Sequence, residues 1–255
     1  MEKPQEKSEN MRRFSPYRII EHWVSALTFA VLVATGLSQR FHGAGLSQWI
    51  VLTLGGIDAV RLLHRAAGLV LFLIFFQHAV VAFFGVLFRK WRPSMIIEKK
   101  DFVDAVENMK YYLGVTDQPA LCDRYNYKQK FEYWGILTGA IIMMLSGFVL
   151  WFPIIVTKYL PGEIIPAAKA LHTNEAMLIV LLVTVWHIYN AIFSPDIFPL
   201  DTSIITGYIS RERMESEHPL ELARLEGRAA GDLSGESRHK EEDAVEAIDI
   251  QRERV

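Results

Sequence analysis

The chain has few of the residues that bind redox cofactors covalently or as clusters. A single cysteine, Cys122, occurs in 255 residues, and no Cys-x-x-Cys-His sequence is present, which excludes a covalently attached c-type haem. One cysteine also cannot hold an iron–sulfur cluster. His-Glu-x-x-His, Walker and Gly-x-Gly-x-x-Gly motifs are absent as well. If electrons pass through this chain, a partner subunit must therefore deliver or remove them.

Aromatic residues are missing from the C-terminal segment 211–255, which is rich in charge instead. This segment holds 13 acidic and 8 basic side chains, so its net charge is −5, whereas that of the whole chain is −2. A segment of this composition has too little apolar surface to form a core. We expect residues 196–255 to form a charged cytoplasmic tail that is partly disordered from about residue 211.

Long apolar stretches occupy most of the remaining chain, and 51% of all residues are hydrophobic. A helix needs about 20 residues to cross about 30 Å of hydrocarbon. We predict an N-terminal arm at 1–18, a membrane domain at 19–195 and a cytoplasmic loop at 89–132. The four spans are predicted at about 19–38, 62–88, 133–156 and 167–193. The predicted fold is all-α, an integral membrane four-helix bundle in up-down-up-down order.

Lysine and arginine are distributed unevenly between the predicted loops. Five lie in the N-terminal arm and nine in the loop 89–132, against no more than two in each of the other loops. Cytoplasmic loops carry the excess of these residues. We therefore expect both termini in the cytoplasm and a multi-pass protein of the bacterial inner membrane.

Five histidines fall inside the predicted spans at two depths. His64 and His78 share the second span, and His172 and His187 share the fourth at nearly the same spacing. A helix rises about 1.5 Å per residue, so each spacing corresponds to about 21–23 Å along the axis, with both rings on broadly the same face. His64 and His172 would lie at the outer level. His22 joins His78 and His187 at the inner level.

Intramembrane histidines are costly without a partner, so they indicate function by default. Two stacked bis-histidine haems would satisfy these rings and place one redox centre near each membrane surface. The outer pair is then His64 with His172, whereas the inner level offers three candidates for two positions.

Two other interpretations of the histidines remain. Each ring could simply hydrogen-bond to a neighbouring helix. A divalent metal is less favoured, because Glu175 is the carboxylate nearest to an outer histidine and no compact metal-ligand spacing occurs. The basic side chains near the outer histidines could contact haem propionates or serve as interfacial charges; they are Arg61, Arg65 and Lys169.

Short motifs across residues 12–195 resemble a known family. They are Arg18-Ile-Ile-Glu-His22-Trp23 and Thr35-Gly36 in the first span, Arg61-Leu-Leu-His64 in the second, Arg124-Tyr-Asn126-Tyr-Lys-Gln129-Lys130 and Ser146-Gly147 at the third, and Leu171-His172 and His187-Ile-Tyr189 in the fourth. The set is similar to the cytochrome b (gamma) subunit of membrane-bound formate dehydrogenases, and to related di-haem cytochromes b of hydrogenases and thiosulfate reductases.

This resemblance implies two b haems and a quinone. The outer haem would be held by His64 and His172, and the inner haem by His22 and His187. Menaquinone or ubiquinone would bind beside the inner haem near His187, with polar contacts from Asn126 and Gln129. The same two amides could instead cap the third span.

His78 departs from the family pattern, because the formate dehydrogenase subunits have an apolar residue at this position. Ligation by two spans alone, as in the cytochrome b of quinol-oxidising bc complexes, would make His78 the inner ligand with His187. We favour His22, whose surrounding motif matches closely. His78 would then line the inner haem or quinone pocket.

The resemblance implies electron transfer across the membrane between a periplasmic partner and the quinone pool. The partner would be an iron–sulfur or cytochrome subunit of a formate dehydrogenase-like oxidoreductase. Alternatives are a hydrogenase, a thiosulfate reductase or a multihaem cytochrome complex, a haem-free membrane anchor, or a self-sufficient transmembrane reductase. The chain itself would be a non-catalytic or quinone-reducing subunit, in contact with lipid and not with nucleic acid.

Overall fold

The computed structural model describes residues 10–194 and 197–227, which form two compact units. The larger unit comprises residues 12–93 and 131–208 and contains the long helices. The smaller unit comprises residues 94–130 and the described residues of the two terminal segments, 10–11 and 209–227.

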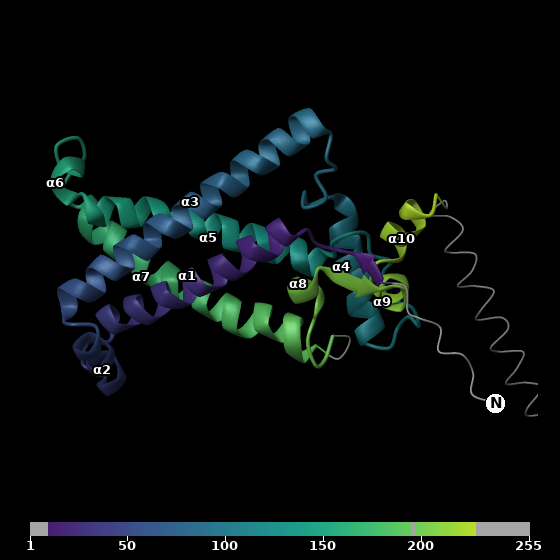
Figure 1. Cartoon of the computed structure of the whole chain (residues 1–255), viewed down its shortest axis with the longest axis horizontal. Coiled ribbons are helices and arrows are strands. Elements are labelled where there is room, and N and C mark those ends of the chain that lie inside the picture. The colour runs from purple at the N-terminus through teal and green to yellow at the C-terminus, as the bar shows by residue number, and fades with distance from the viewer. Residues whose placement is uncertain (1–9, 195–196, 228–255) are drawn as a thin grey trace, which may run out of the picture. The chain divides into compact units, whose positions relative to one another are not determined.

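Four helices in the described residues are long and apolar enough to cross a membrane. They are α1 (Pro16–Arg40), α3 (Ile57–Arg89), α5 (Tyr127–Trp151) and a fourth that runs through α7 (Ile164–Leu181), η1 (Leu182–His187) and η2 (Tyr189–Phe193). Helices α1 and α5 run in one direction, and α3 and α7 run back (Figure 1). The short helices α2 (Gly45–Thr53) and α6 (Pro153–Val156) therefore share one end of this unit. The predicted all-α, four-span architecture is confirmed.

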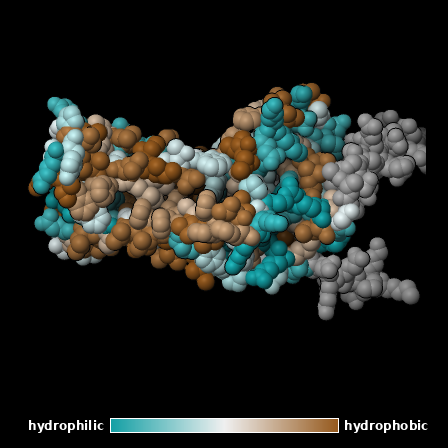
Figure 2. Space-filling view, turned by 90° about the horizontal axis from the view of Figure 1, so that it is seen from above, coloured by the Kyte–Doolittle hydropathy of each residue, from teal (hydrophilic) through white to brown (hydrophobic). Residues whose placement is uncertain are grey.

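The surface of the long helices is apolar. Leu27, Leu62 and Leu145 are 70%, 69% and 66% exposed, respectively. Hydrophobic side chains cover much of the visible face of these helices (Figure 2). A surface of this kind is unstable in water but suits hydrocarbon, where helices satisfy their own backbone hydrogen bonds. The helices therefore present their apolar side chains to lipid.

The helix ends differ from the predicted spans for local reasons. Ser15 caps α1, since its hydroxyl accepts a hydrogen bond from the Arg18 N–H at 3.4 Å. Helix α5 begins earlier than predicted and ends at Trp151, because Pro153 lacks an N–H and starts the separate helix α6. The fourth helix is π-helical over η1 and η2, a form that inserts an extra residue into a helix.

The smaller unit combines the loop between α3 and α5 with parts of both terminal segments. It contains α4 (Lys99–Tyr112), α9 (Arg211–Glu217) and α10 (Pro219–Leu225). Strand β1 (Asn10–Arg12) pairs with β2 (Tyr208–Ser210), which follows α8 (Ser203–Thr206). The core consists of Ile209, Met214 and Leu222, with Met11 packed against it.

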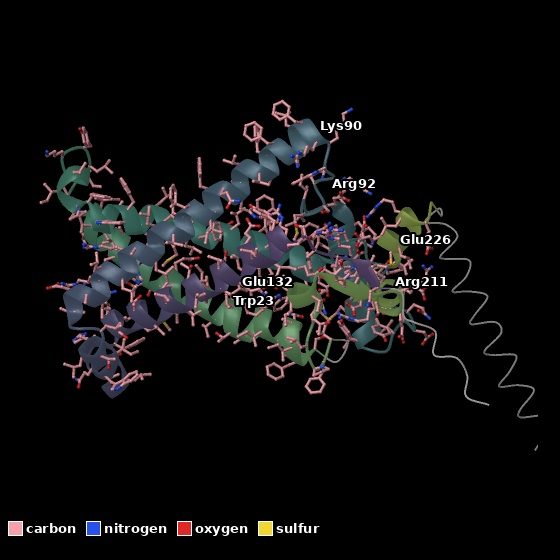
Figure 3. The ribbon with its side chains drawn as sticks, in the orientation of Figure 1. Trp23, Lys90, Arg92, Glu132, Arg211 and Glu226 are labelled. Carbon is pink, nitrogen blue, oxygen red and sulfur yellow. The ribbon has the colours of Figure 1, made fainter. Side chains whose placement is uncertain are left out.

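Ion pairs join the C-terminal helices to the loop. Arg124 donates to Glu221 at 2.5 Å, and Arg224 lies 2.7 Å from Asp123. Arg211 and Glu226 form a further pair (Figure 3). Helices α9 and α10 thus have a core with Ile209 and Met11 and charge partners in the loop, and the partial disorder of the tail stays a prediction. Residues 228–255 lie outside the described residues.

Cys122 lies inside the smaller unit, and its backbone carbonyl accepts a hydrogen bond from the Leu220 N–H at 3.1 Å. Burial, with a smaller effect from the Asp104 carboxylate, raises the pKa of the Cys122 thiol from 9.0 to about 11. The thiolate is the reactive form, so two pKa units lower the reactive fraction about 100-fold near neutral pH.

We expect Cys122 to react with a maleimide about 100-fold more slowly in the folded chain than in the unfolded chain. Labelling rates measured at pH 7.5, with and without denaturant, test this prediction. Equal rates in the two conditions would show that the Cys122 thiol is accessible and that its pKa is not raised in the folded chain.

Candidate functional site

Two histidines face each other near the end of the bundle that carries α2 and α6. His64 comes from α3 and His172 from α7, and their ring centroids are 6.3 Å apart with the ring planes at 75°. The structure thus brings together the two residues that were predicted as the outer pair.

A hydroxyl group holds each of these rings from a neighbouring helix. The Thr35 hydroxyl lies 2.8 Å from Nδ1 of His64, and the Ser146 hydroxyl lies 2.9 Å from Nδ1 of His172. Each hydroxyl also donates to a carbonyl of its own helix at 2.7 Å. Because the hydroxyl proton is used there, the hydroxyl accepts from Nδ1–H, and this network assigns the tautomer. Nε2 of each ring is left with a free lone pair for a metal.

A glycine follows each hydroxyl residue and gives the ring room. A Cβ atom at Gly36 would lie 3.2 Å from Cε1 of His64, and one at Gly147 would lie 3.2 Å from Cε1 of His172. The repeated hydroxyl–glycine pair therefore both orients the imidazole and allows it to approach the helix closely.

A second pair of histidines lies at the other end of the bundle. His22 of α1 and His187 at the end of η1 have ring centroids 6.1 Å apart. Nδ1 of His187 hydrogen-bonds to the carboxylate of Glu132, whose side chain is 11% exposed. Glu132 belongs to α5 and lies at the same end of the bundle as Trp23 (Figure 3). Among the described residues, Nδ1 of His22 is buried and has no hydrogen-bond partner.

His78 is engaged by polar side chains on both ring nitrogens. Its Nδ1 lies 3.0 Å from Oε1 of Glu21 and 3.0 Å from the Arg18 guanidinium. Its Nε2 lies 3.1 Å from the Tyr133 hydroxyl. Both nitrogens of this ring are therefore engaged by side chains, whereas His64 and His172 are bonded at Nδ1.

The contacts reveal two related halves of the bundle. Glu21-His22-Trp23 precedes Thr35-Gly36 by the same interval at which Glu132-Tyr133-Trp134 precedes Ser146-Gly147. Glu21 contacts His78 of the following helix, as Glu132 contacts His187. Glu132 and Tyr133 are not among the predicted site residues, although this internal repeat is a signal that the sequence contains.

The two halves differ at one inner position. Where His187 faces His22, its counterpart His78 faces Tyr133. The π-helical turn before His187 also accounts for its spacing from His172, which is one residue longer than that of His78 from His64.

The structure also places the residues predicted to contact haem propionates and the quinone. The Arg61 guanidinium lies 3.2 Å from Asp58, Arg65 lies over the ring of Trp151, and Lys169 is exposed. In the smaller unit, the Asn126 N–H donates to the Gln129 side chain at 3.1 Å, and the Gln129 N–H donates to the Asn126 side chain at 3.0 Å. These two amides therefore cap α5. Their role at a quinone, like that of the three cations at propionates, stays a prediction.

The donor set suits a haem better than a bare metal ion. Within the described residues, no three His, Cys, Asp or Glu side chains come together to hold a metal. Paired imidazoles supply only two ligands, which is sufficient where a porphyrin provides the other four. A metal–imidazole bond is about 2 Å long, so two imidazoles on one iron have ring centroids about 6 Å apart. Both histidine pairs match this separation.

A four-span bundle with paired intramembrane imidazoles is typical of a membrane-bound b-type cytochrome. Residues 13–207 match the family described as prokaryotic cytochrome b561, and the chain belongs to this family. It is therefore a multi-pass cytochrome b of the bacterial inner membrane that takes part in electron transfer.

Three relatives are informative. The cytochrome b556(fdo) subunit of formate dehydrogenase from Escherichia coli K12 is 24% identical over 84% of this chain and 92% of the relative. The nitrate-inducible cytochrome b556(Fdn) subunit from the same organism is 22% identical over 78% of this chain and 83% of the relative. A Rhodobacter capsulatus protein described as "Probable Ni/Fe-hydrogenase B-type cytochrome subunit" is 25% identical over 73% of this chain and 78% of the relative.

We expect Thr35→Val to weaken haem retention at the outer site by about 10–100-fold, because the His64 ring loses the acceptor that fixes it. Haem transfer from the purified protein to apomyoglobin measures this loss. Thr28→Val is the matched control, since the Thr28 hydroxyl is also buried in α1 and donates to the Val24 carbonyl at 2.7 Å. Equal haem loss in the two variants would contradict the role of Thr35.

Proposed function

We propose that this cytochrome binds two haem b groups, an outer one between His64 and His172 and an inner one between His22 and His187. The single observation that carries the proposal is the separation of the ring centroids, 6.3 Å in the first pair and 6.1 Å in the second. Three of the four rings also have an acceptor at Nδ1, which leaves Nε2 available. Each haem, when bound, supplies a one-electron iron couple.

The inner assignment of His22 is supported by the 6.1 Å separation between its ring and that of His187. Nδ1 of His22 is buried and has no hydrogen-bond partner among the described residues, so no group of the polypeptide competes for this ring. His78, in contrast, has its ring nitrogens satisfied by Glu21, Arg18 and Tyr133. We therefore favour His22 over His78 as the partner of His187.

We further propose that the partner is a periplasmic subunit of a formate dehydrogenase-like oxidoreductase, iron–sulfur or cytochrome in type. Two of the relatives are named as formate dehydrogenase subunits and align over most of their length. A hydrogenase partner is the second candidate, because the relative named as a probable hydrogenase cytochrome subunit has a similar sequence identity to this chain, 25%.

The quinone, menaquinone or ubiquinone, is proposed to react near the inner pair beside His187. It takes up two electrons and two protons to become the quinol, or runs the reverse reaction when the partner is a reductase. Asn126 and Gln129 offer neutral amide groups, which orient quinone carbonyls without adding charge. Their capping bonds use the Asn126 and Gln129 side-chain oxygens and leave the amide N–H groups as donors.

Haem b content per polypeptide, measured by pyridine haemochrome, tests the ligand assignment. We expect two haems in the wild type, one in His64→Ala and one in His22→Ala, because each variant removes one axial ligand. His78→Ala is the matched control at the same depth and keeps both haems. Loss of a haem from His78→Ala with retention in His22→Ala would move the inner ligand to α3. Absence of haem from the wild type in native membranes would leave only a membrane anchor.

We expect both termini in the cytoplasm, because lysine and arginine are concentrated in the N-terminal arm and in the loop before α5. A green fluorescent protein fused to either terminus should fluoresce, whereas alkaline phosphatase fused there should be inactive. Active phosphatase at the C-terminus would reverse the orientation and exchange the inner and outer assignments.

A further inference from the structure

Helix α4 of the smaller unit has its polar face buried and its apolar face exposed. Asp101, Asp104 and Asn108 are 4%, 6% and 7% exposed. On the opposite side, the side chains that form an outward stripe are 53–71% exposed: Phe102, Val103, Val106, Met109 and Leu113. Soluble amphipathic helices have the reverse arrangement.

The buried polar residues explain why α4 is held in this orientation. Lys100, which pairs with Asp104 of the same helix at 2.6 Å, donates to the Leu121 carbonyl of the loop at 2.8 Å. The Asn108 side chain accepts a hydrogen bond from the Ala120 N–H at 2.8 Å. The Asp101 carboxylate lies 2.9 Å from Nζ of Lys130, and both side chains are at most 10% exposed. Turning the helix over would break the contacts that Lys100, Asp101 and Asn108 make outside α4, so its apolar stripe is kept outside.

Both ends of α4 are tied to the first turn of a membrane-spanning helix. Lys130, the partner of Asp101, is on α5. Lys128, also on α5, donates to the Tyr112 hydroxyl at the last residue of α4 at 2.9 Å. The apolar residues of α5 follow directly after Lys130 in the sequence, so α4 is held by the residues that immediately precede a membrane span.

The charges beside the stripe suit an anionic lipid surface. Lys99 and Lys110 are exposed and project at about the angle of Val103 around the helix axis, at the edge of the stripe. Lysine side chains in this position extend along apolar surface and place their ammonium groups among headgroups.

We propose that α4 lies in the interface of the membrane, with the stripe of Phe102, Val103, Val106, Met109 and Leu113 inserted at the boundary between headgroups and acyl chains. The helix thereby anchors the smaller unit to the bilayer. This inference is independent of the haem ligands and of the partner enzyme.

A nitroxide spin label at single cysteines tests the proposal in the full chain. The background is Cys122→Ser, and the chain is purified with the subunits that stay bound and reconstituted in phosphatidylcholine–phosphatidylglycerol vesicles. Val106→Cys places the label on the stripe. Glu107→Cys is the matched control, because Glu107 is the exposed neighbour off the stripe. Haem content verifies that each variant is folded.

We expect the label at residue 106 to collide more with oxygen, which partitions into lipid, than with a water-soluble nickel chelate, and the label at residue 107 to show the opposite. The same result at Met109→Cys would establish the stripe rather than one position. Nickel accessibility at 106 equal to that at 107 would show a stripe in water and overturn the proposal. A label at 106 that is immobilised and shielded from both reagents would show a protein partner on the stripe, which also overturns it.

Discussion

The hydrogen bond at Nδ1 is the interaction that holds three of the four paired histidines, His64, His172 and His187. An imidazole in a membrane span is costly unless both of its nitrogens are satisfied. Thr35 and Ser146 accept from one nitrogen of His64 and His172, and Glu132 binds that of His187. The second nitrogen of each of these rings is thereby left available as a ligand. The placement of the small and polar residues on α1 and α5 follows from this requirement.

The requirement is met twice because the bundle is built from two related halves. A glutamate near the start of the first helix reaches the inner histidine of the next helix, and a hydroxyl–glycine pair farther along the first helix holds the outer histidine. Lys169 also stands three residues before His172, as Arg61 stands before His64. The π-helical turn in the fourth helix absorbs the extra residue of the second half without losing the contact to Glu132.

Length and hydropathy sufficed to predict four spans, and histidine spacing sufficed to predict two levels. Depth alone could not separate His22 from His78, because both lie at the inner level and only packing shows that His78 faces Tyr133. The helices at 211–225 were not predicted for a similar reason. Met214 and Leu222 form a core with Ile209, and Met11, which is distant in sequence, packs against it. Asn126 and Gln129, three residues apart, fit a helix cap and a ligand site equally well on sequence.

The difference between the two halves makes the two inner histidine positions unequal. A fully symmetric bundle would carry two equivalent bis-histidine positions side by side at the inner level, His22 with His187 and a second pair including His78. Tyr133 stands in the place of the missing histidine, and its hydroxyl bonds directly to Nε2 of His78. An oxygen at 3.1 Å leaves no room for an iron, which needs about 2 Å to each ligand. The proposed assignment therefore has one haem at each depth, and the proposed electron path runs from one to the other without a branch.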